Sequence, residues 1–265
     1  MKYLYSCFIL FILFSCQNNG NKHNSAITSD SLKYKMEHFS LRATSCDTLP
    51  DSLCKAYVKA TYPIFEGQKE LNQFIDTLVS SAPLIDNGKP NGIELAAKKF
   101  IKDYEDYKKE FPDAFAGYEW DQTLSVNSQD KNIISFVHKD YVYTAGAHGL
   151  ENEIYHNWSK KEERELSLKD LLIENYTEKL NNLAEKIFRS DEGITETASL
   201  ESYFFENEKF KLNNNFLITS KGLVFIYNPY EIKSYAEGRT TLIIPYSSIQ
   251  DLIKPDGYLS IYKTQ

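Results

Sequence analysis

The chain has 265 residues and a formal net charge of −7, with 42% hydrophobic and 25% charged residues. This length suits one large domain or two smaller ones, and the apolar content is enough for a sizeable core. No basic face is evident in the sequence, so the negative charge argues against nucleic acid as a partner. A cationic protein partner would be tolerated.

The N-terminus has the pattern of a bacterial lipoprotein signal peptide over residues 1–16. Lys2 precedes an apolar run from Tyr3 to Phe14, which as a helix would rise about 18 Å and cannot cross a hydrocarbon core of about 30 Å. That length is typical of a secretory signal peptide. The run ends at Cys16 in a sequence that resembles the lipobox, whose cysteine is acylated and becomes the new N-terminus. We expect acylated Cys16 to hold the protein at a membrane of the cell envelope, facing the periplasm or the exterior. The alternative is an ordinary cleaved signal peptide with an incidental cysteine.

Residues 17–32 are rich in Asn and Ser and poor in apolar residues. Such a composition cannot bury enough apolar surface to fold. This stretch is therefore predicted to be a flexible tether between the anchor and a folded region.

Cys46 and Cys54 are the cysteines that remain after cleavage, and an oxidising envelope compartment would allow them to pair. The apolar alternation opposes a simple hairpin with Cys46 opposite Cys54, because the apolar faces of the two strands would then point in opposite directions. A bulge, or a cysteine placed in the turn, would remove the conflict. A disulfide and two free thiols both stay open.

The first half of the folded region is predicted to contain strands and two amphipathic helices. The second strand alternates clearly and is expected to end at Tyr62-Pro63. The helices carry apolar stripes and must stop before Pro83 and Pro112. These predicted elements are strands 33–45 and 54–62, a helix after Gly67, a helix starting near Asn91, and strands 121–127, 133–143 and 151–159.

The second half is predicted to contain one longer helix over about 176–189 and several short elements. A hairpin pairs Phe216–Thr219 with Leu223–Tyr227 around Ser220-Lys221-Gly222. A strand over Thr240–Pro245 and a short helix over Ser247–Ile253 follow. Helices and antiparallel strands are interspersed without regular alternation, so the predicted fold class is α+β rather than a doubly wound sheet.

The segment Tyr143-Thr144-Ala145-Gly146-Ala147-His148-Gly149 resembles the extracytoplasmic region shared by PdaC, a peptidoglycan deacetylase, and RsiV, a lysozyme-sensing anti-sigma factor. Those proteins typically have glycine where this chain has Ala145. The likeness spans about residues 33–255. Its other segments are Leu166–Leu172, Asn215-Phe216, Gly222–Phe225, Asn228–Ile232, Tyr235–Gly238 and Ile244–Tyr246.

The resemblance implies two closely packed α+β subdomains, with antiparallel sheets and helices on one side, over residues 33–158 and 159–262. It does not carry over an activity, because the deacetylase chemistry belongs to a separate domain that we do not expect here. Nor do we expect the membrane-spanning and cytoplasmic parts of the anti-sigma factor. By analogy at the level of the fold, we expect a non-catalytic binding or sensing module without a cofactor. Its expected partner is a lysozyme-like envelope protein or a cell-wall glycan.

Two groups of motif residues are candidates for a ligand site, and each also has a structural interpretation. Tyr143, Gly146, His148 and Gly149 form the first group; the glycines would permit a tight backbone and His148 would bond the adjacent turn. Asn228 and Tyr230 form the second; Pro229 would end a strand and the Tyr230 hydroxyl would tie down a buried corner. We favour the structural interpretation of both groups.

The sequence contains no G-x-S-x-G, H-E-x-x-H, C-x-x-C, Walker or G-x-G-x-x-G signature. An enzymatic alternative is a metal-assisted hydrolase of cell-wall polymer that uses His138, His148 and His156, with Asp140 nearby. Pairing of the two strands that flank the glycine-rich turn could bring these side chains within ligand distance. The sequence does not fix the register across that turn, so the metal alternative is left open.

Overall fold

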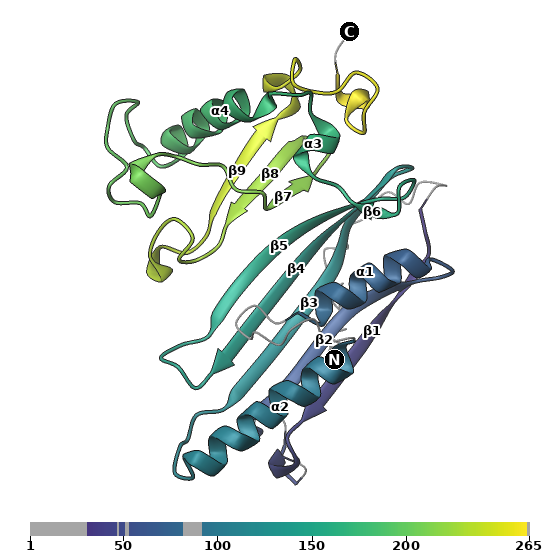
Figure 1. Ribbon diagram of the computed structural model, residues 1–265, viewed down its shortest axis with the longest axis vertical. Helices are drawn as coiled ribbons and strands as arrows, with labels where there is room; N and C mark the ends of the chain where they lie inside the picture. Colours follow the sequence, from purple (N-terminus) through teal and green to yellow (C-terminus); the bar gives the residue numbers. More distant parts are fainter. Residues whose placement is uncertain (1–30, 47, 51–52, 82–91, 264–265) are drawn as a thin grey trace, which may run out of the picture.

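The described part of the chain folds into two sheets, as the computed structural model in Figure 1 shows. The structure describes residues 31–46, 48–50, 53–81 and 92–263, so the signal peptide, Cys16 and most of the tether lie outside the described residues. The first sheet has six strands in the order β1-β2-β3-β4-β5-β6, and the second has three in the order β7-β8-β9. The α+β class predicted from the sequence is confirmed.

The elements of the first part lie within a few residues of their predicted positions. They are β1 (Tyr34–Arg42), β2 (Ala56–Phe65), α1 (Lys69–Val79), α2 (Ile93–Glu110), β3 (Tyr118–Gln129), β4 (Ile133–Thr144), β5 (Leu150–Ser159) and β6 (Arg164–Glu165). The expected end of β2 at Tyr62-Pro63 is wrong. Thr61 is the last β2 residue paired with β3. Pro63 therefore lies beyond the part of β2 that pairs with β3. The N–H that proline lacks is not needed for a hydrogen bond to β3, so the strand can continue through Pro63.

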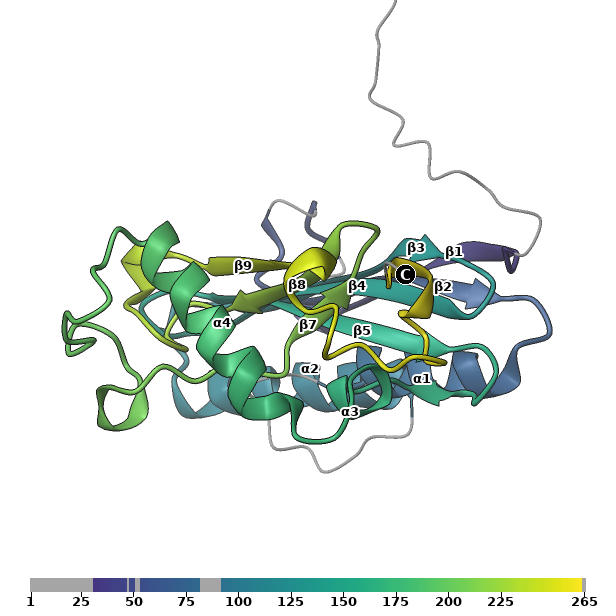
Figure 2. The same cartoon turned by 90° about the horizontal axis from the view of Figure 1, so that it is seen from above.

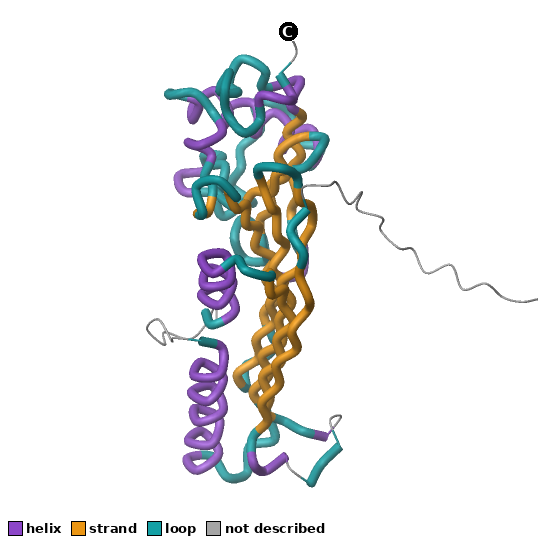
Figure 3. Tube along the Cα trace, turned by 90° about the vertical axis from the view of Figure 1, so that its right-hand side faces the viewer, coloured by secondary structure: helices purple, strands orange, loops and turns teal. Residues whose placement is uncertain are grey.

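Both helices lie on one face of the six-stranded sheet, as the side view in Figure 3 shows. Their apolar stripes pack on the buried side chains of the strands; the rings of Phe100 in α2 and Trp120 in β3, for example, lie 5.8 Å apart. Trp120, Phe136 and Val58 are all fully buried beneath the helices. No described helix covers the opposite face of this sheet.

The expected antiparallel pairing does not hold for one pair of strands. β2 and β3 run parallel, whereas every other described pair is antiparallel. The reason lies in the connection, because α1 and α2 occur between β2 and β3 in the chain. A crossover of this length lets the second strand start again at the same end of the sheet as the first.

The second part contains α3 (Leu168–Leu171), α4 (Tyr176–Asp191), β7 (Phe216–Ile218), β8 (Gly222–Tyr227) and β9 (Thr240–Pro245). Leu180, Ala184 and Phe188 of α4 are buried in a second hydrophobic cluster with the strands, and Figure 2 shows α4 beside β8 and β9. The predicted helix over Ser247–Ile253 is wrong, since only Tyr246–Ser248 forms a short 3-10 turn. Ile253 instead makes a β-bridge to Leu172.

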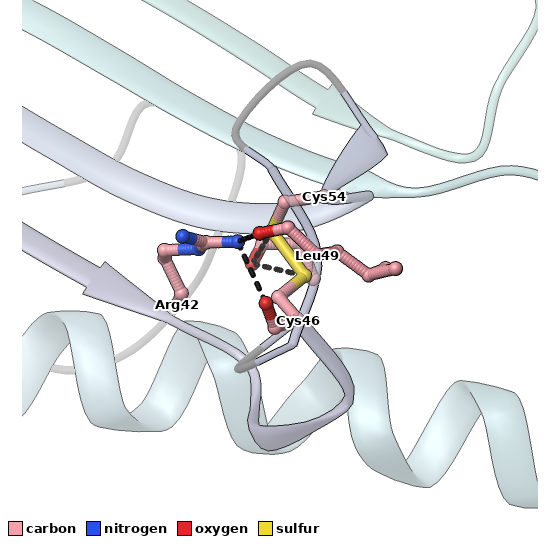
Figure 4. Close-up of a disulfide and its surroundings, with 5 residues drawn as sticks. Arg42, Cys46, Leu49 and Cys54 are labelled. Carbon is pink, nitrogen blue, oxygen red and sulfur yellow. Dashed lines mark hydrogen bonds between the residues drawn. A yellow bond between two sulfur atoms is a disulfide. The ribbon is translucent and has the colours of Figure 1, made fainter.

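Cys46 and Cys54 form a disulfide in the connection between β1 and β2 (Figure 4). β1 ends at Arg42, and Cys46 closes a 3-10 turn over Thr44–Cys46. The cysteine therefore lies in the turn, which is the arrangement that removes the register conflict seen in the sequence. The Arg42 guanidinium donates to the carbonyl oxygens of Cys46 and Leu49 at 2.7 and 2.6 Å.

Asparagine side chains join the two parts of the molecule along β5. The Tyr155 N–H donates to Asn215 Oδ1, and Asn215 Nδ2 donates to the Glu153 carbonyl, both at 2.8 Å. Asn228 repeats the pattern on Glu153, accepting from its N–H at 2.7 Å and donating to its carbonyl at 3.1 Å.

Asn157 lies on β5 itself, and its side chain bonds to the backbone of β7. Its amide accepts from the Ile218 N–H at 2.9 Å and donates to the Phe216 carbonyl at 2.8 Å. We call Asn157, Asn215 and Asn228 the amide seam.

We predict that Asn157→Ala lowers the free energy of unfolding by about 2–4 kcal/mol, because two buried backbone groups of β7 lose their partners. Asn157 is only 1% exposed, so water cannot replace the amide freely. Chemical denaturation of the purified variant measures the change.

The control is Asn214→Ala, which removes an exposed amide from the loop before β7 and is expected to change stability by less than about 0.5 kcal/mol. Equal effects of the two substitutions would contradict a structural role for the seam.

Candidate functional site

The His148 motif lies in the turn between β4 and β5 and contacts the second part of the molecule. His148 Nδ1 is 2.8 Å from the Gly149 carbonyl oxygen, and Nε2 is 3.1 Å from the Tyr230 hydroxyl. The imidazole also stacks on Tyr235 with ring centroids 4.2 Å apart. His148 and Tyr230 are exposed. Both parts of the chain thus contribute to one surface cluster, which consists of His148, Tyr230 and Tyr235. We call it the junction cluster.

The structural interpretation of the glycine-rich turn holds for some of its residues. A Cβ on Gly149 would lie 2.3 Å from the Tyr141 ring, so close packing requires glycine there. Gly146 has no such crowding, since its nearest contact would be 3.9 Å away. The left-handed residue is Ala145, with φ 61°, which explains why glycine suits that position in the similar proteins. No described contact joins Tyr143 to the junction cluster.

Asn228 and Tyr230 have different roles although they are two residues apart. The Asn228 amide belongs to the seam, as the structural interpretation expected. Tyr230 does not tie down a buried corner, because its side chain is 52% exposed. Its backbone is left-handed, with φ 69°, and its hydroxyl lies at His148. The expectation of a buried corner was wrong because the loop projects over the β4–β5 turn.

A groove of about 250 Å³ opens on the helix-free face of the first sheet, beside the junction cluster. Its lining includes Asp121 and Thr123 of β3, Lys139 and Tyr141 of β4, Glu151 of β5, and Arg239 from the loop before β9. Tyr141 links the groove to the cluster, because its ring lies against Gly149, next to His148.

Arg239 orders the acidic side of the groove. Its guanidinium nitrogens lie 3.3 Å from Glu151 and 3.6 Å from Glu153. Glu153 also accepts a hydrogen bond from the Tyr155 hydroxyl at 2.9 Å and lies 3.8 Å from the Lys139 ammonium. Desolvation raises the pKa of the Asp121 carboxyl, and Lys59 opposes the shift. The groove therefore presents donors and acceptors whose charges largely compensate one another.

The groove residues were not singled out from the sequence, although a signal existed. In β4, Lys139 is exposed and Tyr141 is half-buried, and they alternate with the buried His138, Asp140 and Val142. Such alternation indicates a strand with one face in water. It does not reveal that Arg239, far along the chain, completes that face.

The metal alternative is wrong in its geometry, because the three histidines do not converge. His138 and His156 point to the helix-covered face, where their rings are 6.2 Å apart and bond to other partners. His138 Nε2 is 2.8 Å from Gln122 Oε1, and His156 Nδ1 is 2.6 Å from Glu165 Oε1. His148 lies in the exposed turn. Across the described ranges, no group of three or more His, Cys, Asp or Glu side chains could hold a metal ion.

Asp140 belongs to the same buried face as His138. It is 3% exposed and accepts a hydrogen bond from Trp120 Nε1 at 2.8 Å, while its second oxygen has no partner. Burial raises the Asp140 pKa to about 7, although the Trp120 bond opposes the shift. Burial lowers the His138 pKa to about 3, so this imidazole is neutral near pH 7.

The architecture is that of a two-part α+β module, and comparison with known families identifies both parts. Residues 52–151 match the family described as Deacetylase PdaC. Residues 169–247 match a family described as a protein of unknown function, DUF3298. A match to the PdaC model is thus followed along the chain by a match to the DUF3298 model, which confirms the resemblance noted in the sequence.

Two crystal structures show the same fold. A DUF3298 family protein from Pseudomonas aeruginosa PAO1 superposes with a TM-score of 0.68 and 18% identity, over 85% of this chain and 96% of that one. A DUF3298 member from Bacteroides fragilis NCTC 9343 gives 0.68 and 20%, over 88% and 97%. No curated protein matches the chain. Within the described segments, no helix is long and apolar enough to cross a bilayer.

We predict that Asp140→Asn changes the pH dependence of stability. The folded-state pKa of Asp140 lies above its unfolded value of 3.8, so the stability linked to its proton is present below about pH 4 and is lost as pH rises toward 7. Over that range the loss is roughly 4 kcal/mol. The variant cannot ionise, so it gains stability relative to the parent as pH rises. Denaturation at pH 4, 6 and 8 measures the difference.

The control is Asp113→Asn, at an exposed carboxylate, for which the difference from the parent is expected to stay below about 0.5 kcal/mol. A difference between Asp140→Asn and the parent that did not vary with pH would overturn the assignment of a buried, proton-binding carboxyl.

Proposed function

We propose that this protein is a lipid-anchored, non-catalytic binding or sensing module of the bacterial cell envelope. Acylated Cys16 would fix it to a membrane, and residues 17–32 would let the folded part reach nearby envelope components. The ligand would be a cell-wall glycan or a lysozyme-like envelope protein.

The anchoring part of the proposal rests on the sequence of the leader. A short apolar run ending at Cys16 suits export and acylation. Two or three acyl chains on one cysteine, at about 0.8 kcal/mol per buried methylene, suffice for stable attachment. The disulfide between Cys46 and Cys54 also suits an oxidising compartment outside the cytoplasm.

The binding part rests on one observation, the groove and junction cluster on the face of the first sheet that no described helix covers. Concave sites with aromatic side chains and a few convergent polar groups are where proteins bind small ligands. The rings of His148 and Tyr235 lie outside the buried core, so the stacked pair is available to contact a ligand.

We predict that Cys16→Ala releases the protein from the membrane fraction, because no acyl chain can then be attached. Fractionation of cells that express the full chain, followed by immunoblotting, measures the distribution. Mass spectrometry of the parent should find an acylated N-terminal cysteine. The control is Cys7→Ala, which alters the leader but not the proposed modification site. Equal membrane association of the Cys16→Ala variant and the parent would refute the anchor.

We predict that the purified full chain is retained by cell-wall sacculi or by immobilised lysozyme, and that the double substitution His148→Ala, Tyr235→Ala weakens this retention several-fold. The physical reason is the loss of two surface rings that together form a contact platform. Co-sedimentation and surface capture measure it. Phe115→Ala is the control, because this ring is 95% exposed in the loop between α2 and β3 and lies outside the site. Retention by neither material would contradict the proposed function.

A further inference from the structure

The lining of the groove restricts the chemistry of its ligand. Asp121 and Glu151 supply acceptors, Lys139 and Arg239 supply donors, and Thr123 supplies a hydroxyl that can do both. A sugar ring carries many hydroxyl groups, each of which donates one hydrogen bond and accepts others. A ligand with this mixed capacity can satisfy carboxylates and cations at the same time.

The pairing of charges disfavours a strongly charged ligand. Arg239 lies between Glu151 and Glu153, and Lys139 also lies near Glu153. An anion would have to compete with these carboxylates for Arg239, and a cation would have to compete with Arg239 for the carboxylates. A neutral ligand can bond to the outer oxygens and nitrogens while the ion pairs persist.

Aromatic rings border the groove on the side of the junction. Tyr141 lies between Asp121 and Glu151 in the strand register, and beyond it come His148 and Tyr235, stacked at 4.2 Å. The apolar C–H face of a sugar ring packs on such rings, while its hydroxyl groups reach the polar lining. A volume of about 250 Å³ is below the range of about 300–1,000 Å³ that encloses a whole drug-sized ligand. The groove therefore suits one sugar ring, and the rest of a glycan chain would lie across the junction cluster.

From this arrangement we propose that the groove binds an uncharged glycan chain, with one sugar ring on Tyr141 and the next toward His148 and Tyr235. The inference rests on the proposed function and specifies its ligand class as neutral glycan rather than protein. Tyr141 provides the stacking face, whereas Asp121 and Arg239 bond to hydroxyl or amide groups of the sugar.

The test is isothermal titration of the full chain, in detergent, with a tetramer of N-acetylglucosamine. We expect saturable binding, about tenfold weaker for Tyr141→Ala and little changed for Tyr141→Phe, which keeps the ring. The Phe variant matters because the Tyr141 ring also packs on Gly149, so loss of binding in the Ala variant alone could reflect misfolding. Asp121→Asn should weaken binding by a smaller factor, since an amide oxygen still accepts.

A tetramer of glucosamine is the matched charged probe, because it replaces each neutral acetamide by an ammonium group. Weaker binding of this probe supports the inference, and equal or tighter binding overturns the preference for a neutral ligand. Retention by sacculi or lysozyme without any binding of the N-acetylglucosamine tetramer, or with full affinity in Tyr141→Ala, overturns the inference but leaves the proposed function standing. No binding to any of these materials overturns both.

Discussion

The open edge of β5 is the constraint on which the arrangement of the molecule depends. An edge strand presents backbone N–H and C=O groups that must find partners, and β6 pairs only with Trp158 and Ser159. Farther along β5, the amide seam supplies hydrogen-bond partners for its backbone. The side chains of Asn215 and Asn228 bond to backbone groups of Glu153 and Tyr155, as the backbone of a neighbouring strand would. The same bonds fix the second sheet against the first.

This seam also creates the candidate site, because the site is shared between the parts that the seam joins. Asn228 holds the start of a loop on β5, and that loop carries Tyr230, Tyr235 and Arg239 to the face of the first sheet. These bonds therefore help to place Arg239 near Glu151 and Tyr230 near His148. In the proposed function, a ligand in the groove would contact residues of both parts, which is a physical route by which it could favour one relative position of the two sheets.

Local patterns in the sequence predicted the elements, and long-range pairing explains what they missed. The apolar stripes of α1 and α2 and the alternation of β4 were sufficient to place these elements. The parallel pairing of β2 with β3 depends on how the intervening helices α1 and α2 pack on the sheet. No local sequence pattern predicts that packing. The contact between His148 and Tyr230 joins residues 82 positions apart. Motif residues 143–149 and 228–232 could be named from the sequence, but that they meet could not, nor that Tyr141 and Arg239 join them.

The surroundings of His138 and His148 bear on whether either histidine could transfer a proton at the candidate site. His138 is buried and neutral near pH 7, because burial lowers its pKa to about 3, and its ring bonds to the Gln122 side chain on the helix-covered face of the sheet. His148 is at the surface, but both of its ring nitrogens already lie within hydrogen-bond distance of Gly149 and Tyr230. A general acid or base needs a nitrogen directed at the reacting group. An imidazole held at both nitrogens, with its face stacked on Tyr235, is better suited to serve as a rigid contact surface, and this geometry supports a binding role for the junction cluster.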